Sequence, residues 1–245
     1  MNKKYTYVWV SLIILIFGII VIPRIVARLS SSTVVENDRL NGSNVNASLN
    51  EPLGYILLDG KKRKVPSFKF INQDSVVVTE NDYLGKVYVV DFFFTRCPSI
   101  CPMMTTNLVS IQNSFKGKDD FGIASFSITP DFDTPEVLRT YMEKYGITDE
   151  GWNFMTGDKE AVYDLANAGF NIFAAEMPDV PGGFEHSGLF ALVDKQGYLR
   201  SRKDEFGNPI VYYRGSILEE DGTNDQGEAE EIGILRADIK KLLEE

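Results

Sequence analysis

Apolar and polar positions divide the chain into an apolar N-terminal run, a polar segment and a long region of alternating strand-like and helix-like patterns. Between Val87 and Phe94 nearly every residue is β-branched or aromatic, which is typical of a strand covered on both faces. We expect this strand at the centre of a sheet. Further strands are predicted at residues 65–70, 75–78, 122–128 and 189–194, with a returning strand from Tyr198 onward.

Helical patterns separate the later strands. They cover residues 103–115, 135–145, 159–168 and 237–243. The second has a clear start signal, because Asp133 supplies a capping side chain, Pro135 lies in the first turn, and Glu136 follows three residues after Asp133. Strands that alternate with helices, followed by a hairpin and a last helix, predict an α/β sandwich of the thioredoxin type, a central mixed sheet flanked by helices.

The N-terminal run has the properties of a membrane anchor. Residues 5–23 carry no charge, and a helix needs about 20 such residues to cross a bilayer. Aromatic residues lie near its start, and Arg24 and Arg28 follow its end. A removable signal peptide is the alternative, but the residues after Pro23 offer no cleavage site of the A-x-A kind. We therefore expect residues 1–28 to form an uncleaved transmembrane helix.

The flanking charges indicate how such an anchor is oriented. Lys3, Lys4 and the free amine favour an N-terminus in the cytoplasm and a domain outside it. The apolar run begins too early for a mitochondrial presequence, which favours the cytoplasmic membrane of a bacterium and a periplasmic, or more generally extracytoplasmic, domain. The polar, turn-rich residues 29–52 are interpreted as a flexible linker.

We assign residues 53–245 to one thioredoxin-like domain. A chain of 245 residues with 44% hydrophobic composition has enough apolar material for one well-buried core plus appendages. Within it, an acidic insert at about residues 219–231 carries seven carboxylates and is expected to be a solvated loop. The net charge of -10 argues against nucleic acid as a partner, because phosphate neutralisation needs clustered Lys and Arg. The acidic composition instead favours proteins or ions as partners.

Both cysteines of the chain, Cys97 and Cys101, directly follow the predicted central strand. Pro102 fits a helix only within its first three positions, so the helix begins no earlier than about Ser99. Cys97 is therefore expected in the loop and Cys101 in the first turn or its cap. Unpaired backbone N–H groups there stabilise thiolates, which favours both nucleophilic and metal-ligating roles.

Three intervening residues distinguish this pair from a Cys-x-x-Cys redox motif. If both were helical, their Cβ atoms would lie about 5 to 6 Å apart, whereas a disulfide needs about 3.8 Å. The loop position of Cys97 leaves oxidation open. A soft cation can instead lie between the sulfurs, and two sulfurs with one imidazole suit copper in either common oxidation state.

His186, the only histidine, precedes the predicted strand at residues 189–194. Taken alone, such a histidine is more often structural or solvent-facing than a ligand. In a thioredoxin-like arrangement, however, the loop before this strand lies beside the N-terminus of the first helix, where the cysteines are. Glu185 is a candidate to orient the imidazole from a second shell. Asp133 is a candidate for a second-shell or docking role, although capping already accounts for it.

Three features together resemble the Sco/SenC family of cytochrome oxidase copper-assembly proteins over residues 66–200. They are the segment Phe94 to Pro102, the sequence Asp133-Thr134-Pro135 before a helix, and His186 before a strand that ends in Asp194-Lys195-Gln196-Gly197. The resemblance implies one copper ion per chain, bound by Cys97, Cys101 and His186. It also implies delivery of copper, or of reducing equivalents, to the copper centre of a terminal oxidase. Family members commonly carry Asp-Pro where this chain has Thr129-Pro130.

Two enzymatic alternatives stay open. The first is a membrane-anchored thiol-disulfide reductase that acts through Cys97 and Cys101, although such enzymes usually place a cis-proline at the position of His186. The second is a peroxidase, for which Arg96 would be the partner of Cys97, but the surrounding motif differs. Metal binding requires His186, whereas thiol exchange should tolerate its replacement by alanine.

Overall fold

The computed structural model describes residues 15, 17, 52–180, 182–203 and 209–245. The chain divides into two compact units, residues 1–42 and 43–245. Within the described part, no helix is long and apolar enough to cross a membrane. Apart from Leu15 and Phe17, the anchor predicted at residues 1–28 lies outside the described residues, and so does the predicted linker apart from Pro52.

The second unit is built on a ten-stranded mixed sheet. Its centre is β6 (Val87–Phe93), which pairs in parallel with β7 (Phe121–Ser127), and β7 pairs in parallel with β8 (Trp152–Thr156). Every residue of β6 and β7 is buried. The prediction of a central strand covered on both faces is therefore confirmed.

The remaining strands are antiparallel to their neighbours and extend the sheet on both sides. The order is β1-β12-β11-β6-β7-β8-β4-β5, with β13 paired to β12 and β14 paired to β11. Their bounds are Gly54–Tyr55 (β1), Lys69–Asn72 (β4), Val77–Thr79 (β5), Leu189–Val193 (β11), Leu199–Lys203 (β12), Pro209–Ile210 (β13) and Tyr212–Arg214 (β14). Two small ribbons are separate from this sheet: β2 (Leu57–Leu58) with β3 (Lys61–Lys62), and β9 (Ala174–Glu176) with β10 (Phe184–His186).

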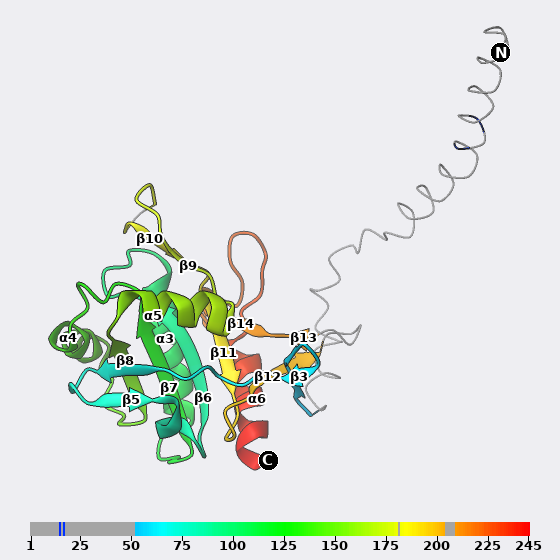
Figure 1. Ribbon diagram of the computed structural model, residues 1–245, viewed down its shortest axis with the longest axis horizontal. Coiled ribbons are helices and arrows are strands. Elements are labelled where there is room, and N and C mark those ends of the chain that lie inside the picture. The colour runs from blue at the N-terminus through cyan, green and yellow to red at the C-terminus, as the bar shows by residue number, and fades with distance from the viewer. Residues whose placement is uncertain (1–14, 16, 18–51, 181, 204–208) are drawn as a thin grey trace, which may run out of the picture. The chain divides into compact units, whose positions relative to one another are not determined.

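Helices cover both faces of the sheet (Figure 1). On one face Phe93 contacts Tyr141 of α4, with ring centroids 5.5 Å apart, while on the other face Phe92 contacts Phe170 at 5.9 Å. These alternating neighbours follow from the two-residue period of a strand. The helices are η2 (Glu80–Tyr83), α3 (Ile100–Ser114), α4 (Pro135–Tyr145), α5 (Lys159–Asp164), the π-helical turn η3 (Leu165–Phe170) and α6 (Ile232–Glu244). This mixed α/β arrangement is the predicted thioredoxin-like fold.

Several element predictions need correction. The helix predicted at residues 159–168 is α-helical only to Asp164 and then widens into the π-helical η3. Helix α6 begins at Ile232, five residues before its predicted start. Strand β8 was not predicted, because its sequence Trp-Asn-Phe-Met-Thr has little β-branched character and buries four of its five residues.

No residue of the acidic insert at 219–231 is buried, and two of its carboxylates contact α6. Glu219 forms a bidentate ion pair with Arg236 of α6, at 2.5 and 2.6 Å. Glu230 accepts hydrogen bonds from the backbone N–H groups of Ile232 and Gly233 at the start of α6. Glu230 therefore stabilises the first turn of the last helix, where negative charge is favourable, and Glu219 attaches the insert to the same helix.

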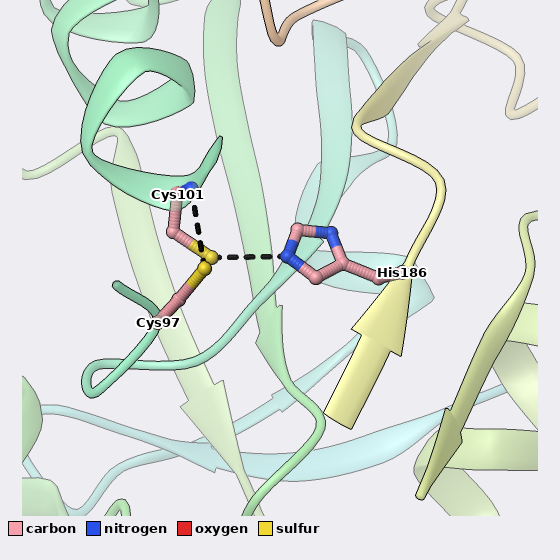
Figure 2. Close-up of side chains that lie close together, drawn as sticks. All are labelled: Cys97, Cys101 and His186. Carbon is pink, nitrogen blue, oxygen red and sulfur yellow. Dashed lines mark hydrogen bonds between the residues drawn. The ribbon is translucent and has the colours of Figure 1, made fainter. Parts of the chain in front are cut away.

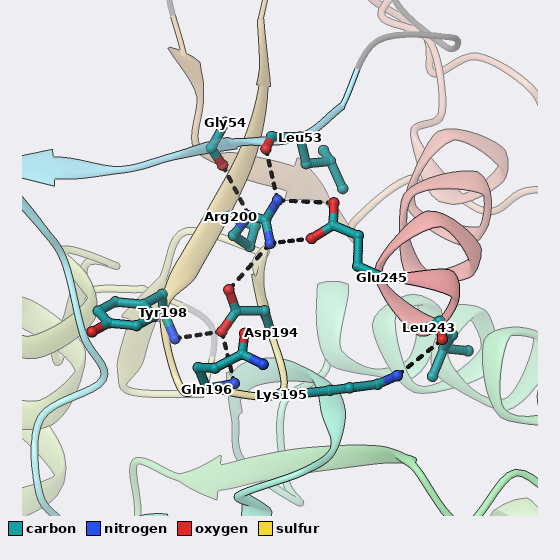
Figure 3. Close-up of polar contacts among 9 residues, drawn as sticks. All are labelled: Leu53, Gly54, Asp194, Lys195, Gln196, Tyr198, Arg200, Leu243 and Glu245. Atoms are coloured by element: carbon teal, nitrogen blue, oxygen red, sulfur yellow. Dashed lines mark hydrogen bonds and ion pairs between the residues drawn. The ribbon is translucent and has the colours of Figure 1, made fainter.

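Arg200 on β12 connects three distant parts of the domain (Figure 3). Its guanidinium group lies 3.2 Å from Asp194 and 2.7 Å from Glu245, and it donates to the carbonyl of Leu53 at 2.7 Å. Only 3% of the arginine side chain is exposed. The start of the described domain and the end of α6 are thus both attached to the same buried cation.

Candidate metal centre

The cysteine segment lies at the carboxyl end of the central strand. Strand β6 ends at Phe93, and α3 begins at Ile100 with Ser99 as its N-cap. Cys97 is therefore in the connecting loop, and Cys101 is the second residue of the helix, with Pro102 at the third position, where its missing N–H is not needed. The predicted placement of both cysteines relative to the helix start is confirmed.

Cys97, Cys101 and His186 converge on one point (Figure 2). Their Sγ and ring nitrogen atoms all lie within 4.8 Å of one another, and each residue is buried. The Nε2 atom of His186 is 3.0 Å from Cys101 Sγ, and the backbone N–H of Cys101 donates to Cys97 Sγ at 3.4 Å. Both thiols are free rather than joined in a disulfide.

The β9–β10 hairpin delivers the histidine. His186 is the last residue of β10, is paired with Ala174, and packs edge-on against Phe94 with centroids 5.9 Å apart. Gly182 in the hairpin turn has φ of +91°, and a Cβ atom there would lie 3.1 Å from Pro98 and 3.2 Å from the Phe94 ring. The hairpin turn is thus packed against the cysteine loop, and this close approach requires a glycine.

The two thiols differ in their electrostatics. The hydrogen bond from Cys101, helped by His186 and by backbone N–H groups, lowers the pKa of Cys97 well below that of an ordinary thiol. Burial, followed by the adjacent Cys97 thiolate, raises the pKa of Cys101. Because one thiolate disfavours a second beside it, the site favours the thiolate at Cys97 over one at Cys101.

Asp133 fixes the loop that carries Cys97. Its fully buried carboxylate accepts hydrogen bonds from the hydroxyls of Thr95 at 2.5 Å, Ser127 at 2.5 Å and Thr129 at 2.9 Å, and from the backbone N–H of Thr95 at 3.2 Å. The expected capping role is wrong, because the N-cap of α4 is Thr134, whose hydroxyl accepts from the backbone N–H of Val137. Asp133 instead joins the cysteine loop to the end of β7.

Two other sequence candidates have exposed side chains. The side chain of Glu185 is exposed on β10, whereas His186 beside it is buried, as alternation along a strand requires. The carboxylate of Glu185 makes no hydrogen bond or ion pair with another described residue, although its backbone is paired with Ala175 of β9. The guanidinium group of Arg96 lies 3.5 Å from the centre of the Phe132 ring, a cation–π contact, and Arg96 is exposed.

Asp91 was missed by the sequence analysis. It lies inside β6 and accepts a 2.5 Å hydrogen bond from Ser125, which in turn accepts from the indole N–H of Trp152. Burial raises the pKa of Asp91 to about 7, and the negative charge of this carboxylate raises the pKa of Cys101 further.

In the sequence, Asp91 could have been noticed as a single carboxylate within an otherwise apolar strand. For Thr95, Ser127 and Thr129, the signal was the cluster of small hydroxyl residues at the ends of two neighbouring strands.

A family model described as SCO1/SenC matches residues 58–214, well over half of the chain and including all three converging side chains. The chain belongs to the SCO1/SenC family. Among its relatives, the SCO1 protein homolog of Bacillus subtilis is 30% identical over 151 residues, which cover 61% of this chain and 74% of the relative.

Solved structures agree with this membership. A SCO1/SenC family lipoprotein from Bacillus anthracis is 27% identical with a TM-score of 0.58, over 74% of this chain and 95% of the relative. BsSco, described as a Sco-family cytochrome c oxidase assembly protein with a disulfide switch, is 25% identical with a TM-score of 0.59, over 78% and 98%. Copper-bound ScoI of Bradyrhizobium japonicum shares the fold, with 22% identity and a TM-score of 0.51, over 58% and 89%.

Proposed function

We propose that this protein binds one copper ion through Cys97, Cys101 and His186 and passes copper, or reducing equivalents, to the copper centre of a terminal cytochrome oxidase. The observation that carries the proposal is the convergence of two sulfurs and one imidazole nitrogen within 4.8 Å. Copper is the cargo in this scheme. Membership in the SCO1/SenC family supports the choice of metal and of recipient.

The donor set suits copper for a chemical reason. Thiolates select soft cations such as Cu(I), and an imidazole nitrogen also accommodates Cu(II). The lowered pKa of Cys97 favours a thiolate ligand at that position, and metal binding would displace the proton of Cys101. Burial of all three side chains limits competition from water for the metal.

The location of the domain is part of the proposal. We place it on the outer side of a bacterial cytoplasmic membrane, held by a single N-terminal helix at residues 1–28 whose N-terminus is cytoplasmic. The relative from Bacillus anthracis is described as a lipoprotein, which supports membrane association of the domain.

Copper titration of the full chain, followed by spectroscopy of the Cu(II) form, tests the ligand set. We expect one tightly bound copper, a sulfur-to-copper charge-transfer band, and a large loss of affinity in each of the variants Cys97→Ser, Cys101→Ser and His186→Ala. Glu185→Ala is the matched control, because it alters the neighbouring residue and should leave affinity unchanged. Full affinity in His186→Ala would refute the proposed copper site.

Thiol-disulfide exchange is the second candidate, favoured by the depressed pKa of Cys97 and by the disulfide switch described for BsSco. The Cys97 thiolate would attack a partner's disulfide, and Cys101 would then release the mixed disulfide by forming the Cys97–Cys101 bond, with the partner left reduced. A His186→Ala variant that retains this exchange but loses copper separates the two activities.

A further inference from the structure

A short two-stranded ribbon with exposed leucines and lysines lies at one edge of the sheet. It consists of β2 and β3, which are joined by a two-residue turn at Asp59 and Gly60, with φ of +50° and +73°. Leu57 and Leu58 are 62% and 58% exposed, more than any other large hydrophobic residue described between residues 52 and 245. Two adjacent leucines are thus left outside the core and are available to contact a partner.

The base of the ribbon is firmly held, so the leucines are presented by fixed backbone. Ile56 donates to the Leu199 carbonyl at 3.1 Å, and Leu199 donates to the Arg63 carbonyl at 3.0 Å. The guanidinium group of Arg63 binds the carbonyls of Ala168 and Gly169 at the end of the π-helical turn. Arg63 is therefore used within the fold, and the residues beyond it project from the edge.

The ribbon is basic in a chain whose net charge is -10. Lys61, Lys62 and Lys64 are exposed. The ammonium group of Lys62 lies 3.4 Å from the centre of the Tyr55 ring, while Lys61 and Lys64 form no ion pair among the described residues. Asp59 in the turn is the one acidic residue of the segment from 57 to 64.

We propose that the β2–β3 ribbon docks on an anionic phospholipid bilayer. Leu57 pairs with Lys62 and Leu58 pairs with Lys61, so each face of the ribbon carries one leucine and one lysine. When the tip of the ribbon enters the headgroup region of a bilayer, lipid surrounds both faces, so that leucines on opposite faces are covered together. The leucines enter the headgroup boundary, while the lysines extend their stems and leave their charges at the phosphates.

This docking is compatible with an accessible metal centre. The ribbon lies beside β12 and β13 at one edge of the sheet, well apart from the β9–β10 hairpin that carries His186 (Figure 1). A bilayer contact through the ribbon thus leaves the cysteine loop free to meet another protein. The inference is independent of copper binding, because no residue of the ribbon belongs to the metal centre.

Hydrogen exchange of the full chain tests the proposal. The protein is reconstituted into nanodiscs of phosphatidylcholine alone or of phosphatidylcholine mixed with phosphatidylglycerol, and exchange is followed by mass spectrometry in peptides that cover residues 56–63. We expect several-fold slower exchange of this segment in the anionic nanodiscs only, reversed by high salt because exposed charges are screened. The rest of the domain serves as the internal reference.

Matched variants assign the effect to charge and to the leucines. The double variant Lys61→Gln with Lys64→Gln should abolish the protection, because each lysine removed weakens binding of the ribbon to the anionic bilayer by roughly fivefold. The double variant Leu57→Ser with Leu58→Ser should abolish it as well. Lys116→Gln with Lys118→Gln changes the net charge equally at exposed positions after α3 and should have no effect. Asp59→Asn removes the opposing carboxylate and should increase protection.

Three results would overturn the inference. The first is equal exchange of residues 56–63 in neutral and anionic nanodiscs. The second is protection that survives high salt or persists after both Lys61 and Lys64 are replaced. The third is protection in solution without lipid, which would assign the ribbon to a protein contact instead.

Discussion

Replacement of Asp133 offers a quantitative test of how the fold positions the metal centre. Its carboxylate is fully buried, has four hydrogen-bond donors around it, and binds Thr95 two residues before Cys97. In Asp133→Ala all four donors lose their acceptor. A buried donor without a partner costs about 1–3 kcal/mol, and some of the hydroxyls can rotate toward other acceptors.

We therefore expect Asp133→Ala to lower the free energy of unfolding by about 3–5 kcal/mol. Asp133→Asn keeps one oxygen acceptor, and the hydroxyls can accept from its amide group, so a loss of about 1–2 kcal/mol is expected. Because the loop before Cys97 then loses its fixed position, copper affinity of the folded Asn variant should fall by roughly 10- to 100-fold.

Urea unfolding followed by circular dichroism measures the stability, and competition with a copper chelator measures the affinity. Asp131→Ala is the matched control, because that carboxylate lies two residues earlier but its side chain is 84% exposed. Its stability should change by no more than about 0.5 kcal/mol. Unchanged stability in Asp133→Ala, or unchanged copper affinity in Asp133→Asn, would refute the positioning role.

Three other predictions concern ionisable groups. Since the pKa of Cys97 is lowered, the rate of its alkylation by iodoacetamide should vary little between weakly acid and neutral solution. The rate for an ordinary thiol falls about tenfold for each unit by which the pH is lowered. Mass spectrometry of the alkylated peptide measures the rate at each pH. Arg200→Met leaves the buried carboxylate of Asp194 without its cation and should cost about 3–5 kcal/mol in urea unfolding. Arg139→Met, at an ion pair with more than half of each side chain exposed, should cost less than about 1 kcal/mol. The pKa of Asp91 is raised to about 7 in the folded state, whereas an aspartate in the unfolded chain has a pKa of about 3.9. Between pH 4 and 7 the folded protein therefore holds a proton that the unfolded chain has lost, and the free energy of unfolding falls as the pH rises. Asp91→Asn should therefore stabilise the protein more at pH 8 than at pH 5, by on the order of a few kcal/mol, and equal effects at the two pH values would contradict this assignment.

The sequence predicted the metal centre through local features. A proline can follow Cys101 only near the start of a helix, which placed one cysteine in the first turn and the other in the loop. The continuous apolar run of β6 predicted a strand buried on both faces. The contact with His186 could be expected only through the fold, because a lone histidine before a strand carries no signal about its neighbours in space.

The role of Asp133 shows the limit of local patterns. The sequence Asp133-Thr134-Pro135 predicts a helix capped by Asp133; the helix does begin at Pro135, but its cap is Thr134. The local sequence does not contain the hydroxyls of Thr95 and Ser127, which come from the ends of two other strands. Their convergence is what removes Asp133 from the helix cap and places it under the cysteine loop.

The sequence by itself determined the central strand, the start of the cysteine helix and the chemistry of the three donors, because each depends on residues that are neighbours along the chain. Only the tertiary structure decided which of the two thiols has the lowered pKa, what holds the cysteine loop, and that two leucines and their lysines form an exposed ribbon. These properties depend on burial and on contacts between distant segments, which the packing of the sheet and its helices creates.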